Sequence, residues 1–544
     1  MDFQKQYLWW QTGVIYQIYP RSFKDTSGNG IGDLAGIIEK MDYLTDTLGV
    51  DAIWISPFYP SPMKDFGYDV ADYVDVDPLF GDLKTFDELI KKAHQRCLRV
   101  IIDLVINHTS DQHTWFLESR SSKKNPKRDW YVWVDPKPDG SPPNNWLSVF
   151  GGSAWEWDDR TGQYYLHSFL KEQPDLNYRN PQVWNAMEGV IRFWLDRGVD
   201  GFRIDVAHYI MKDPQLRDNP IVSTPKQRGH RPLYEYDTQE HLYDKGHADL
   251  HGIYRKFRRI LDSYDGDWPR VSVGEVHIFE SEEWVKYYGD NLDEIHLPFN
   301  FKLLYSKWDA QTVRAVVDEL EAILPVGAWP NYVLGNHDES RLASRIGKSQ
   351  TRVAAMLLLT LRGTPTLYMG DEIGMTDVKI PLDRIQDPPG LIHPIFSRDP
   401  CRTPMQWDDS VNAGFSGVDT RSLWLPLAGD FQAINVKQAL SRSDSLLNLY
   451  RQLLAYRRKT PALQWGEYCP IDRVPESCFA FTRLAETGPM LLVALNFASS
   501  DLKVSIPELG KGKIALSTLL DRSGQVDCKE LSLRKDEGVI VELD

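Results

Sequence analysis

The stretch GFRIDVAH, residues 201–208, has the alternation of a β-strand with charge on one face. Arg203 and Asp205 take one set of alternate positions, and the other set is apolar: Phe202, Ile204 and Val206. Residues i and i+2 of a strand point to the same side. We therefore predict that a guanidinium and a carboxylate lie side by side near the end of an otherwise apolar strand.

Seven further segments have the same strand character, and most are followed by a helix-like pattern. They are residues 13–20, 51–58, 99–108, 270–277, 294–300, 331–338 and 364–371. The sequences between them are amphipathic, as in LAGIIEKMDYLTDTLGV, residues 34–50. Eight alternations of strand and helix predict an α/β fold, the parallel (β/α)₈ or TIM barrel.

Two gaps between the predicted strands are too long for ordinary loops. We predict a barrel built from residues 1–103 and 178–460 and interrupted after the third strand by an inserted subdomain, residues 104–177. Residues 212–250 follow the fourth strand, are polar, and predict a lid-like loop. Strand-like runs without intervening helices predict an all-β C-terminal sandwich over residues 461–544.

The composition indicates a large globular protein that does not bind polyanions. The chain has 544 residues, of which 42% are hydrophobic, and a formal net charge of −15. Nucleic acids and anionic membranes favour Lys/Arg patches, so we expect neither as a partner. Five cysteines without a C-x-x-C pair, and a start that does not resemble a signal peptide, favour a cytoplasmic location. We expect a monomer or a homodimer.

Charged and imidazole side chains follow several of the predicted strands. The carboxyl ends of barrel strands meet at one rim, where active sites of this fold lie. The side chains expected there are His108, Arg203, Asp205, Glu275, His337 and Asp338. A buried Asp–Arg pair or a single histidine is often structural, but the whole set at one rim suits glycoside hydrolysis, in which two carboxylates flank the bond.

The surroundings of each carboxylate predict its part in that reaction. Arg203 would lower the pKa of Asp205 and keep it ionised as the nucleophile. Glu275 lies in the apolar run VSVGEV without an adjacent cation, which predicts a raised pKa and the role of acid. Asp338 would stabilise the positive charge of the transition state, while His337 and His108 bind sugar hydroxyls.

Four of these segments, in order, resemble the signature regions of glycoside hydrolase family 13, the α-amylase family. They are DLVINH (103–108), GFRIDVAH (201–208), GEVH (274–277) and LGNHD (334–338). QPDLN (173–177) is similar to the fifth region of the family. Four further runs resemble the oligo-1,6-glucosidase and α-glucosidase branch of this family: WWQTGVIYQIYPRSF (9–23), FGYDVADY (66–73), PPNNWLSVFGGSAWEWD (142–158) and CRTPMQWD (401–408).

The resemblance implies retaining hydrolysis with Asp205 as nucleophile, Glu275 as acid/base and Asp338 as stabiliser. It also implies that Asp65 and Arg402 clamp the far hydroxyls of the terminal glucose, which would make cleavage exo. Tyr68 and Phe169 would form stacking walls, although both rings could equally pack in the core. An exo-α-glucosidase that also transfers glucose is therefore the expected activity.

The preferred linkage depends on the residue that follows the nucleophile. In this branch Val tends to accompany α-1,6 activity, so Val206 favours isomaltose-type substrates. The run GEVH departs from the GEM of oligo-1,6-glucosidases and keeps an α-1,4-preferring maltase as an alternative. Glucoside mutases of the trehalose synthase or sucrose isomerase type also stay open as candidate functions, and so do non-catalytic transporter heavy chains.

The loop DTSGNGIGD, residues 25–33, has the alternating oxygen ligands of a cation site. The candidate ligands are Asp25, Ser27, Asn29, the carbonyl of Ile31, and Asp33. Two formal charges among oxygen ligands suit a structural Ca²⁺ or Mg²⁺ ion. A glycine-rich turn without an ion is the alternative, and no organic cofactor is expected.

Overall fold

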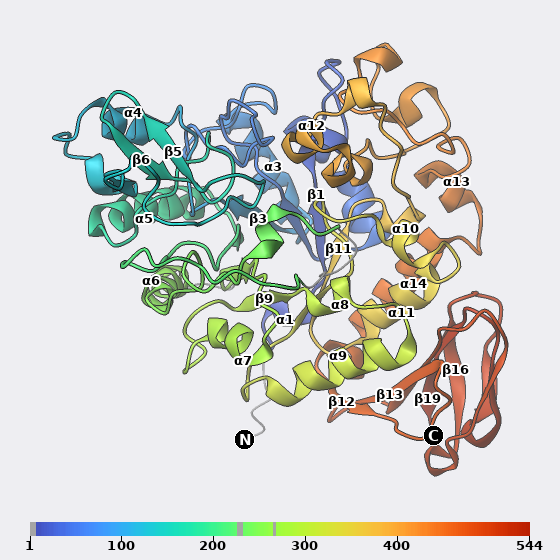
Figure 1. Ribbon diagram of the computed structural model, residues 1–544. Helices are drawn as coiled ribbons and strands as arrows, with labels where there is room; N and C mark the ends of the chain where they lie inside the picture. Colours follow the sequence, from blue (N-terminus) through green and yellow to red (C-terminus); the bar gives the residue numbers. More distant parts are fainter. Residues whose placement is uncertain (1–6, 226–231, 265–267) are drawn as a thin grey trace.

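The computed structural model describes residues 7–225, 232–264 and 268–544. Eight parallel strands close into a barrel in the order β1-β11-β10-β9-β8-β7-β3-β2, which confirms the predicted TIM barrel (Figure 1). The strands are β1 (Ile15–Ile18), β2 (Ala52–Ile55), β3 (Arg99–Leu104), β7 (Gly201–Ile204), β8 (Val271–Gly274), β9 (Leu297–Asn300), β10 (Asn331–Val333) and β11 (Thr364–Tyr368).

Every barrel strand is shorter than its predicted segment. The alternation of residues 201–208, for example, continues beyond the end of β7 at Ile204. The residues beyond the strands leave the hydrogen-bonded ladder and turn over the rim, where their side chains are no longer fixed by the pleat. The residues that carry the predicted chemistry lie in or next to these short extensions.

Helices between the strands cover the outside of the barrel. α3 (Leu83–Gln95) shows why: Asp82 caps its first turn by accepting from the Thr85 N–H, and its buried residues recur at helical spacing (Phe86, Leu89, Ile90 and Ala93). The remaining α-helices outside the insertion, which include those before β1 and after β11, are α1 (Trp9–Thr12), α2 (Leu34–Glu39), α5 (Pro181–Asp196), α6 (Leu250–Asp262), α7 (Ser281–Trp284), α8 (Lys302–Tyr305), α9 (Ala310–Ile323), α10 (Leu342–Ile346), α11 (Thr351–Thr360), α12 (Pro388–Ile392), α13 (Val436–Ser441), α14 (Leu446–Lys459) and α15 (Pro461–Gln464).

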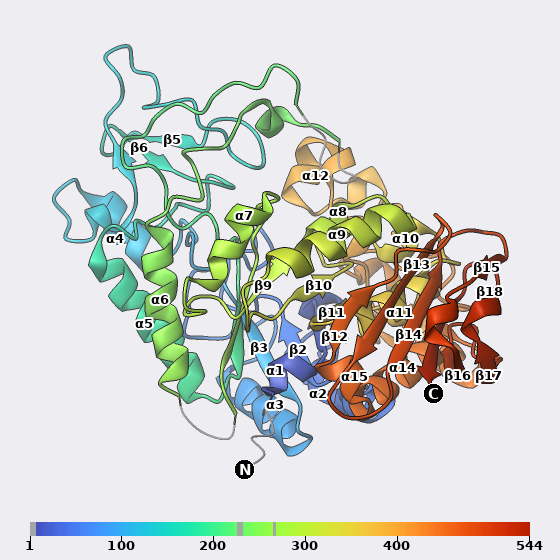
Figure 2. The same ribbon diagram turned by 90° about the horizontal axis from the view of Figure 1, so that it is seen from below.

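An insertion follows β3, as predicted. It holds α4 (Thr114–Ser121) and a small sheet of β4 (Trp133–Val134), β6 (Gln163–Leu166) and β5 (Trp155–Asp158). The segment that follows β7 joins this insertion, since the indole N–H of Trp146 donates to the Arg217 carbonyl over 2.8 Å. Figure 2 shows the insertion, this segment and α12 on the same side of the barrel.

The predicted lid-like loop, 212–250, lies partly outside the described residues, since 226–231 are not described. Its described parts bond to the insertion: the Asn145 side chain donates to the Asn219 carbonyl over 2.8 Å. The predicted domain boundaries, and closure of this segment over a substrate, stay predictions. Both segments nevertheless stand at the end of the barrel that carries the candidate site.

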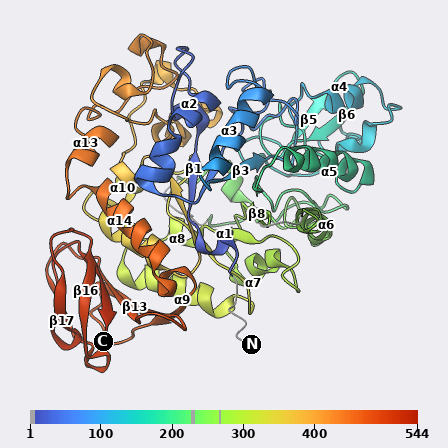
Figure 3. The ribbon, with the colours of Figure 1, turned by 180° about the vertical axis from the view of Figure 1, so that it is seen from behind.

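The C-terminal part is all β, as predicted. One antiparallel sheet runs in the order β12-β13-β14-β19-β16-β17, and β15 pairs with β18. The strands are β12 (Glu467–Pro470), β13 (Cys478–Leu484), β14 (Leu491–Asn496), β15 (Leu502–Val504), β16 (Lys511–Ser517), β17 (Gly524–Asp527), β18 (Leu531–Leu533) and β19 (Gly538–Leu543). This domain packs beside α9 and α11, away from the insertion (Figure 3).

Within the described ranges, no helix combines the length and the apolar character needed to cross a bilayer. The cytoplasmic location and the oligomeric state stay predictions.

Candidate active site

The carboxyl ends of β3, β7 and β8 bring one guanidinium and three carboxylates together. Arg203 Nη1 lies 2.8 Å from Asp103 Oδ1 and 2.9 Å from Asp205 Oδ1, and Nη2 donates to Glu275 Oε2. The guanidinium also lies 4.8 Å from the centre of the Trp54 ring. We call Asp103, Arg203, Asp205 and Glu275 the Arg203 cluster. The predicted contact between Arg203 and Asp205 is confirmed, and Asp103 is a member that the sequence analysis missed.

The surroundings of Glu275 differ from the sequence-based expectation. Besides Arg203, the Val206 backbone N–H donates to Oε2 over 3.1 Å, and His277 Nε2 lies 2.7 Å from Oε1. The prediction that Glu275 has no adjacent cation is therefore wrong. It failed because Arg203 belongs to the neighbouring strand, and adjacency across a sheet is not visible in a linear run of residues.

Ionisation of the pair follows from these contacts. Burial, and then the charge of Glu275, raises the pKa of Asp205 well above its usual range, outweighing Arg203. Burial also opposes ionisation of Glu275, but Arg203 and then His277 bring its pKa below the usual range. Both directions are the reverse of the predicted ones, and because the two carboxyl groups interact strongly they titrate as a pair.

The backbone is strained immediately after Asp205. Val206 has a φ of 37°, a conformation that β-branched residues rarely adopt. The turn directs the Val206 N–H toward Glu275, and the Ala207 N–H donates to the Glu275 carbonyl over 2.9 Å. Strain of this kind persists where the surrounding contacts hold it, often at functional sites. The Val206 side chain packs among Phe169 and Tyr209.

A second cluster of opposite charges surrounds Asp338. Its Oδ1 accepts from Arg398 Nη1 over 3.1 Å and from Arg402 Nη2 over 2.7 Å. Arg398 also donates to Asp65 over 2.8 Å and to Asp387 over 2.7 Å. We call Asp65, Asp338, Asp387, Arg398 and Arg402 the Arg398 cluster. Arg398 is thus the ion-pair partner of Asp65, and the clamping of glucose hydroxyls by Asp65 and Arg402 stays a prediction.

Asp338 is the most open of the three candidate catalytic carboxylates. Its side chain is 29% exposed, against 8% for Asp205 and 7% for Glu275. Burial opposes its ionisation, but His337 and the two arginines hold the pKa of Asp338 far below its usual range. Asp338 is therefore a fixed negative charge that is partly open to solvent.

Two neutral imidazoles and an aromatic ring complete this side of the site. Tyr68 stacks on His337 with 5.4 Å between ring centres, and its hydroxyl lies 2.7 Å from His337 Nε2. Burial lowers the pKa of His337 to about 3 and that of His108 to about 4. The Phe169 ring lies 5.3 Å from the His108 ring. The predicted set thus converges on one rim, with the roles of its members still predictions.

The comparisons with known proteins agree with this geometry. Residues 17–466 match the family described as Alpha amylase, catalytic domain. The chain belongs to the α-amylase family. It is 46% identical over 475 residues to a probable alpha-glucosidase of Rhizobium meliloti (strain 1021), with 84% of each chain covered. It is 36% identical to the oligo-1,6-glucosidase of Parageobacillus thermoglucosidasius, covering 98% of this chain and 99% of the relative.

Among solved structures, the crystal structure of the alpha-glucosyl transfer enzyme XgtA superposes with a TM-score of 0.92 at 41% identity. The superposition covers 99% of this chain and 100% of that chain. The family, and with it a glycoside hydrolase of the α-glucosidase type, is therefore established by sequence and by fold. Membership of the family does not by itself define the preferred linkage or the balance between hydrolysis and glucose transfer.

Besides Asp103, sequence reasoning missed three polar residues of this α-amylase family site: Arg398, Asp387 and His277. Arg398 stands four positions before Arg402 in the run SRDPCRTP, residues 397–404, so the density of arginines was the available signal. Asp387 offered none, because it lies in a polar loop far from every predicted strand. His277 belongs to the quoted run GEVH, but its contact with Glu275 depends on a turn at the end of β8.

The predicted cation loop is closed by its own hydrogen bonds. Asp25 accepts from the N–H groups of Gly28 and Gly30, each over 2.8 Å. Asp33 caps α2 through the Gly36 N–H at 2.7 Å, and Asn29 accepts from the Ile31 N–H at 2.8 Å. Each of these side-chain oxygens accepts a backbone N–H, as in a turn that closes without an ion. The Ca²⁺ or Mg²⁺ site stays a prediction, and no step of the reaction is derived from it.

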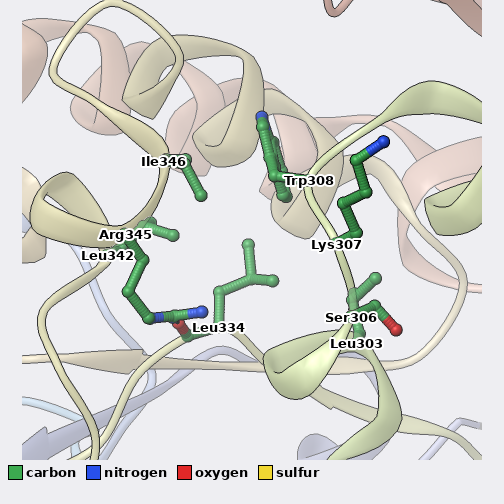
Figure 4. Close-up of a pocket in the computed structure, with 8 residues that line it drawn as sticks. All are labelled: Leu303, Ser306, Lys307, Trp308, Leu334, Leu342, Arg345 and Ile346. Atoms are coloured by element: carbon green, nitrogen blue, oxygen red, sulfur yellow. The ribbon is translucent and has the colours of Figure 1, made fainter. Parts of the chain in front are cut away.

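A depression of about 290 Å³ lies between α8 and α10 (Figure 4). Its lining includes Trp308, Lys307 and Arg345, but no member of either cluster. The Arg345 guanidinium donates to the Ser340 and Leu304 carbonyls, each over 2.8 Å. The arginine thus stabilises the backbone between β10 and α10, and the depression is separate from the candidate active site.

Proposed function

We propose that the protein is a retaining exo-α-glucosidase that releases α-glucose from the non-reducing end of short α-glucosides. The observation that carries this proposal is that Asp205 and Glu275 bind one guanidinium. Two carboxyl groups so close leave no room for a water between nucleophile and sugar, which is the arrangement of retaining enzymes. Family membership supports the same reaction.

In the first step of the proposed mechanism, Asp205 attacks the anomeric carbon and Glu275 protonates the glycosidic oxygen. The C–O bond to the leaving group breaks as the ester bond to Asp205 forms. When this step begins, the proton of the coupled pair must therefore lie on Glu275 and Asp205 must be ionised. Arg203 contacts both carboxylates and stabilises the negative charge wherever it lies.

In the second step Glu275 takes a proton from water, whose oxygen attacks the anomeric carbon and releases Asp205. The product keeps the α-configuration because two inversions have occurred. Asp338 remains ionised throughout and stabilises the oxocarbenium-like transition state. His337 is neutral, with Nε2 2.7 Å from the Tyr68 hydroxyl and Nδ1 2.7 Å from the Gln17 side-chain nitrogen, so it holds the Tyr68 ring in place beside the sugar.

The Arg398 cluster supports exo action. Its ion pairs tie Asp65, Asp387 and Asp338 together on one side of the rim. Charged groups fixed in this way bind the hydroxyls of a terminal glucose and block continuation of the chain beyond it. Arg402 contributes through Asp338, to which it donates over 2.7 Å.

We infer a preference for α-1,6 over α-1,4 linkages from Val206. Its side chain is fixed by a strained turn and packs against Phe169, where it narrows the space next to the nucleophile. One methyl group in an apolar pocket changes selectivity by ~1–3 kcal/mol, so the preference is modest. The alternative is a maltase that prefers α-1,4 linkages. Faster cleavage of isomaltose than of maltose would exclude it.

Transfer of glucose is the second candidate reaction. Val206, Phe169 and Tyr209 form an apolar group immediately beside Asp205. Apolar side chains next to a glycosyl ester favour an organic acceptor over water, and the similarity to an alpha-glucosyl transfer enzyme supports this interpretation. The acceptor would attack as water does, with Glu275 taking its proton.

The test is glucose release from isomaltose, maltose, sucrose and trehalose, with Asp205→Asn as the blank. We expect isomaltose to be cleaved fastest and the first product to be α-glucose, as followed by NMR of the fresh reaction. Faster cleavage of maltose would keep the mechanism and overturn the linkage preference. Activity on none of the four above the blank would overturn the proposed function.

A further inference from the structure

His277 lies on the solvent side of Glu275, in the loop that follows β8. Its Nε2 is 2.7 Å from Glu275 Oε1. The His277 side chain is 28% exposed, whereas that of Glu275 is 7% exposed. The other oxygen, Oε2, already accepts from Arg203 and from the Val206 N–H. Oε1 is therefore the oxygen left to protonate a leaving group, and His277 is its neighbour.

The imidazole of His277 is itself held in place. It stacks on Phe301, with ring centres 4.2 Å apart and an angle of 5° between the planes. The Tyr305 hydroxyl, at the end of α8, donates to Glu339 over 2.6 Å and ties that end to the loop after β10. An imidazole fixed in its plane presents Nε2 in one direction, so the contact with Glu275 has a defined geometry.

We propose that His277 is a positioning residue for the leaving-group side of the reaction, which holds Glu275 Oε1 where the glycosidic oxygen must be protonated. This role rests on the proposed function of Glu275 as acid/base. His277 acts through Glu275 and does not exchange a covalent bond. Phe301 supports it by fixing the plane of the ring.

The charges around Glu275 and His277 determine in which direction the loss of His277 changes the pKa of Glu275. Arg203 and then His277 lower the pKa of Glu275, although burial opposes them. On the barrel side the facing groups are Asp103, Arg203, Asp205 and Asp338. On the outer side they are Tyr305, Glu339 and His208. Burial lowers the pKa of His208 well below its usual range, so His208 is neutral and does not replace His277.

The test compares His277→Leu with His277→Gln on two substrates. One is a disaccharide, whose leaving group needs a proton, and the other is 4-nitrophenyl α-glucoside, whose leaving group does not. We expect His277→Leu to lower kcat/KM on the disaccharide by about 10- to 100-fold, the usual effect of losing a hydrogen bond to a charged group. The loss on the nitrophenyl substrate should be below about 3-fold. Glutamine keeps an N–H donor and should restore most of the activity.

The pH profile is the second readout. Removal of the His277 donor raises the pKa of Glu275, so the alkaline limb of kcat/KM should move to higher pH in His277→Leu. His94→Leu is the matched control, since His94 Nε2 also lies 2.7 Å from a carboxylate, Asp200, beside the start of β7. That variant should leave both the substrate ratio and the pH profile unchanged.

Two results would overturn the inference. One is an equal loss on both substrates with an unshifted pH profile, and the other is a glutamine variant no better than leucine; both would make His277 purely structural. Thermal unfolding of each variant verifies that it is folded. A wild-type protein inactive on both substrates would instead overturn the proposed function, and the role of His277 with it.

Discussion

The two charged clusters at the barrel rim differ in their balance of charge. The Arg203 cluster sets three carboxylates around one guanidinium, whereas the Arg398 cluster sets three carboxylates around two. Burial and then the neighbouring negative charge raise the pKa of Asp205 in the first cluster, whereas in the second His337 and the two arginines lower the pKa of Asp338 against its burial. Burial and local charge together thus separate a coupled pair with a raised pKa from a carboxylate that stays ionised.

This difference fits the proposed reaction. Acid/base chemistry needs a proton that moves between two groups, and the Arg203 cluster, with one cation for three carboxylates, supplies it. Stabilisation of positive charge needs a carboxylate that never accepts that proton, and the Arg398 cluster, with two cations for three carboxylates, holds one. Substitutions in each cluster test the comparison, from the largest expected effect to the smallest.

The largest effect is expected from Asp205→Ala, which removes the proposed nucleophile. We expect kcat to fall by ~10⁴-fold or more, as when the nucleophile of a covalent mechanism is deleted. Added azide should then restore release of the leaving group from an activated α-glucoside and form β-glucosyl azide, the product of inverted configuration. Failure of azide to rescue the folded variant would argue against Asp205 as nucleophile.

Arg203→Met should destabilise the protein because it leaves Asp103, Asp205 and Glu275 buried without their shared cation. Breaking a buried ion pair costs about 3–5 kcal/mol of unfolding free energy. Burial already raises the pKa of Asp103 to about 6. Carboxyl groups with raised pKa values destabilise the folded state as they ionise, so the deficit should grow from pH 5 to pH 8.

The measurement for this variant is chemical denaturation of Arg203→Met and wild type at several pH values. A deficit that shrinks toward high pH would contradict the assignment of surplus negative charge to the Arg203 cluster. Wild-type protein provides the reference, because its own cluster keeps the cation at every pH.

In the second cluster, Arg398→Lys should weaken substrate binding while preserving the fold. A lysine carries the charge but lacks the planar fork that reaches Asp65, Asp338 and Asp387 together. We expect kcat/KM to fall by about 10- to 100-fold, mostly through KM.

Arg534→Lys is the matched control for this change. Arg534 also bridges two carboxylates, Asp521 and Glu537, but in the C-terminal domain. That variant should alter stability without altering KM. If both lysine variants changed KM alike, the effect of Arg398→Lys would have to be assigned to stability rather than to the site.

A smaller effect is expected from Val206→Ala and Val206→Thr. The ratio of isomaltose to maltose cleavage should fall by about tenfold in each, within the ~1–3 kcal/mol that a methyl-sized change allows. Val206→Leu serves as a control for added volume without β-branching. An unchanged ratio in all three variants would show that linkage preference lies elsewhere.

The smallest effect concerns the predicted cation loop. Asp25, Asn29 and Asp33 already accept N–H donors, and an ion would have to displace some of them. Excess Ca²⁺ should therefore raise Tm by no more than about 2 °C over the value in EDTA, which corresponds to less than ~1 kcal/mol for a domain of this size. A larger rise, lost in Asp25→Asn, would establish a tight site.

The sequence alone determined the barrel, the insertion after β3 and the all-β C-terminal part. Strand-like runs separated by amphipathic helices have one common solution, because both faces of a parallel sheet must be covered. It also placed Asp205, Glu275 and Asp338 at one rim, since the ends of parallel strands meet there. The pairing of Arg203 with Asp205 followed from the two-residue period of a strand.

The tertiary structure decided which groups share a charge. Arg203 contacts Glu275 across the β7–β8 boundary, and Arg398 reaches Asp65 over more than 300 positions of sequence. The tertiary structure likewise decided the positive φ of Val206 and the turn that brings His277 to Glu275. Periodicity fixes the face on which a side chain lies, but the pKa of a buried group depends on distances and desolvation, which only the packed chain defines.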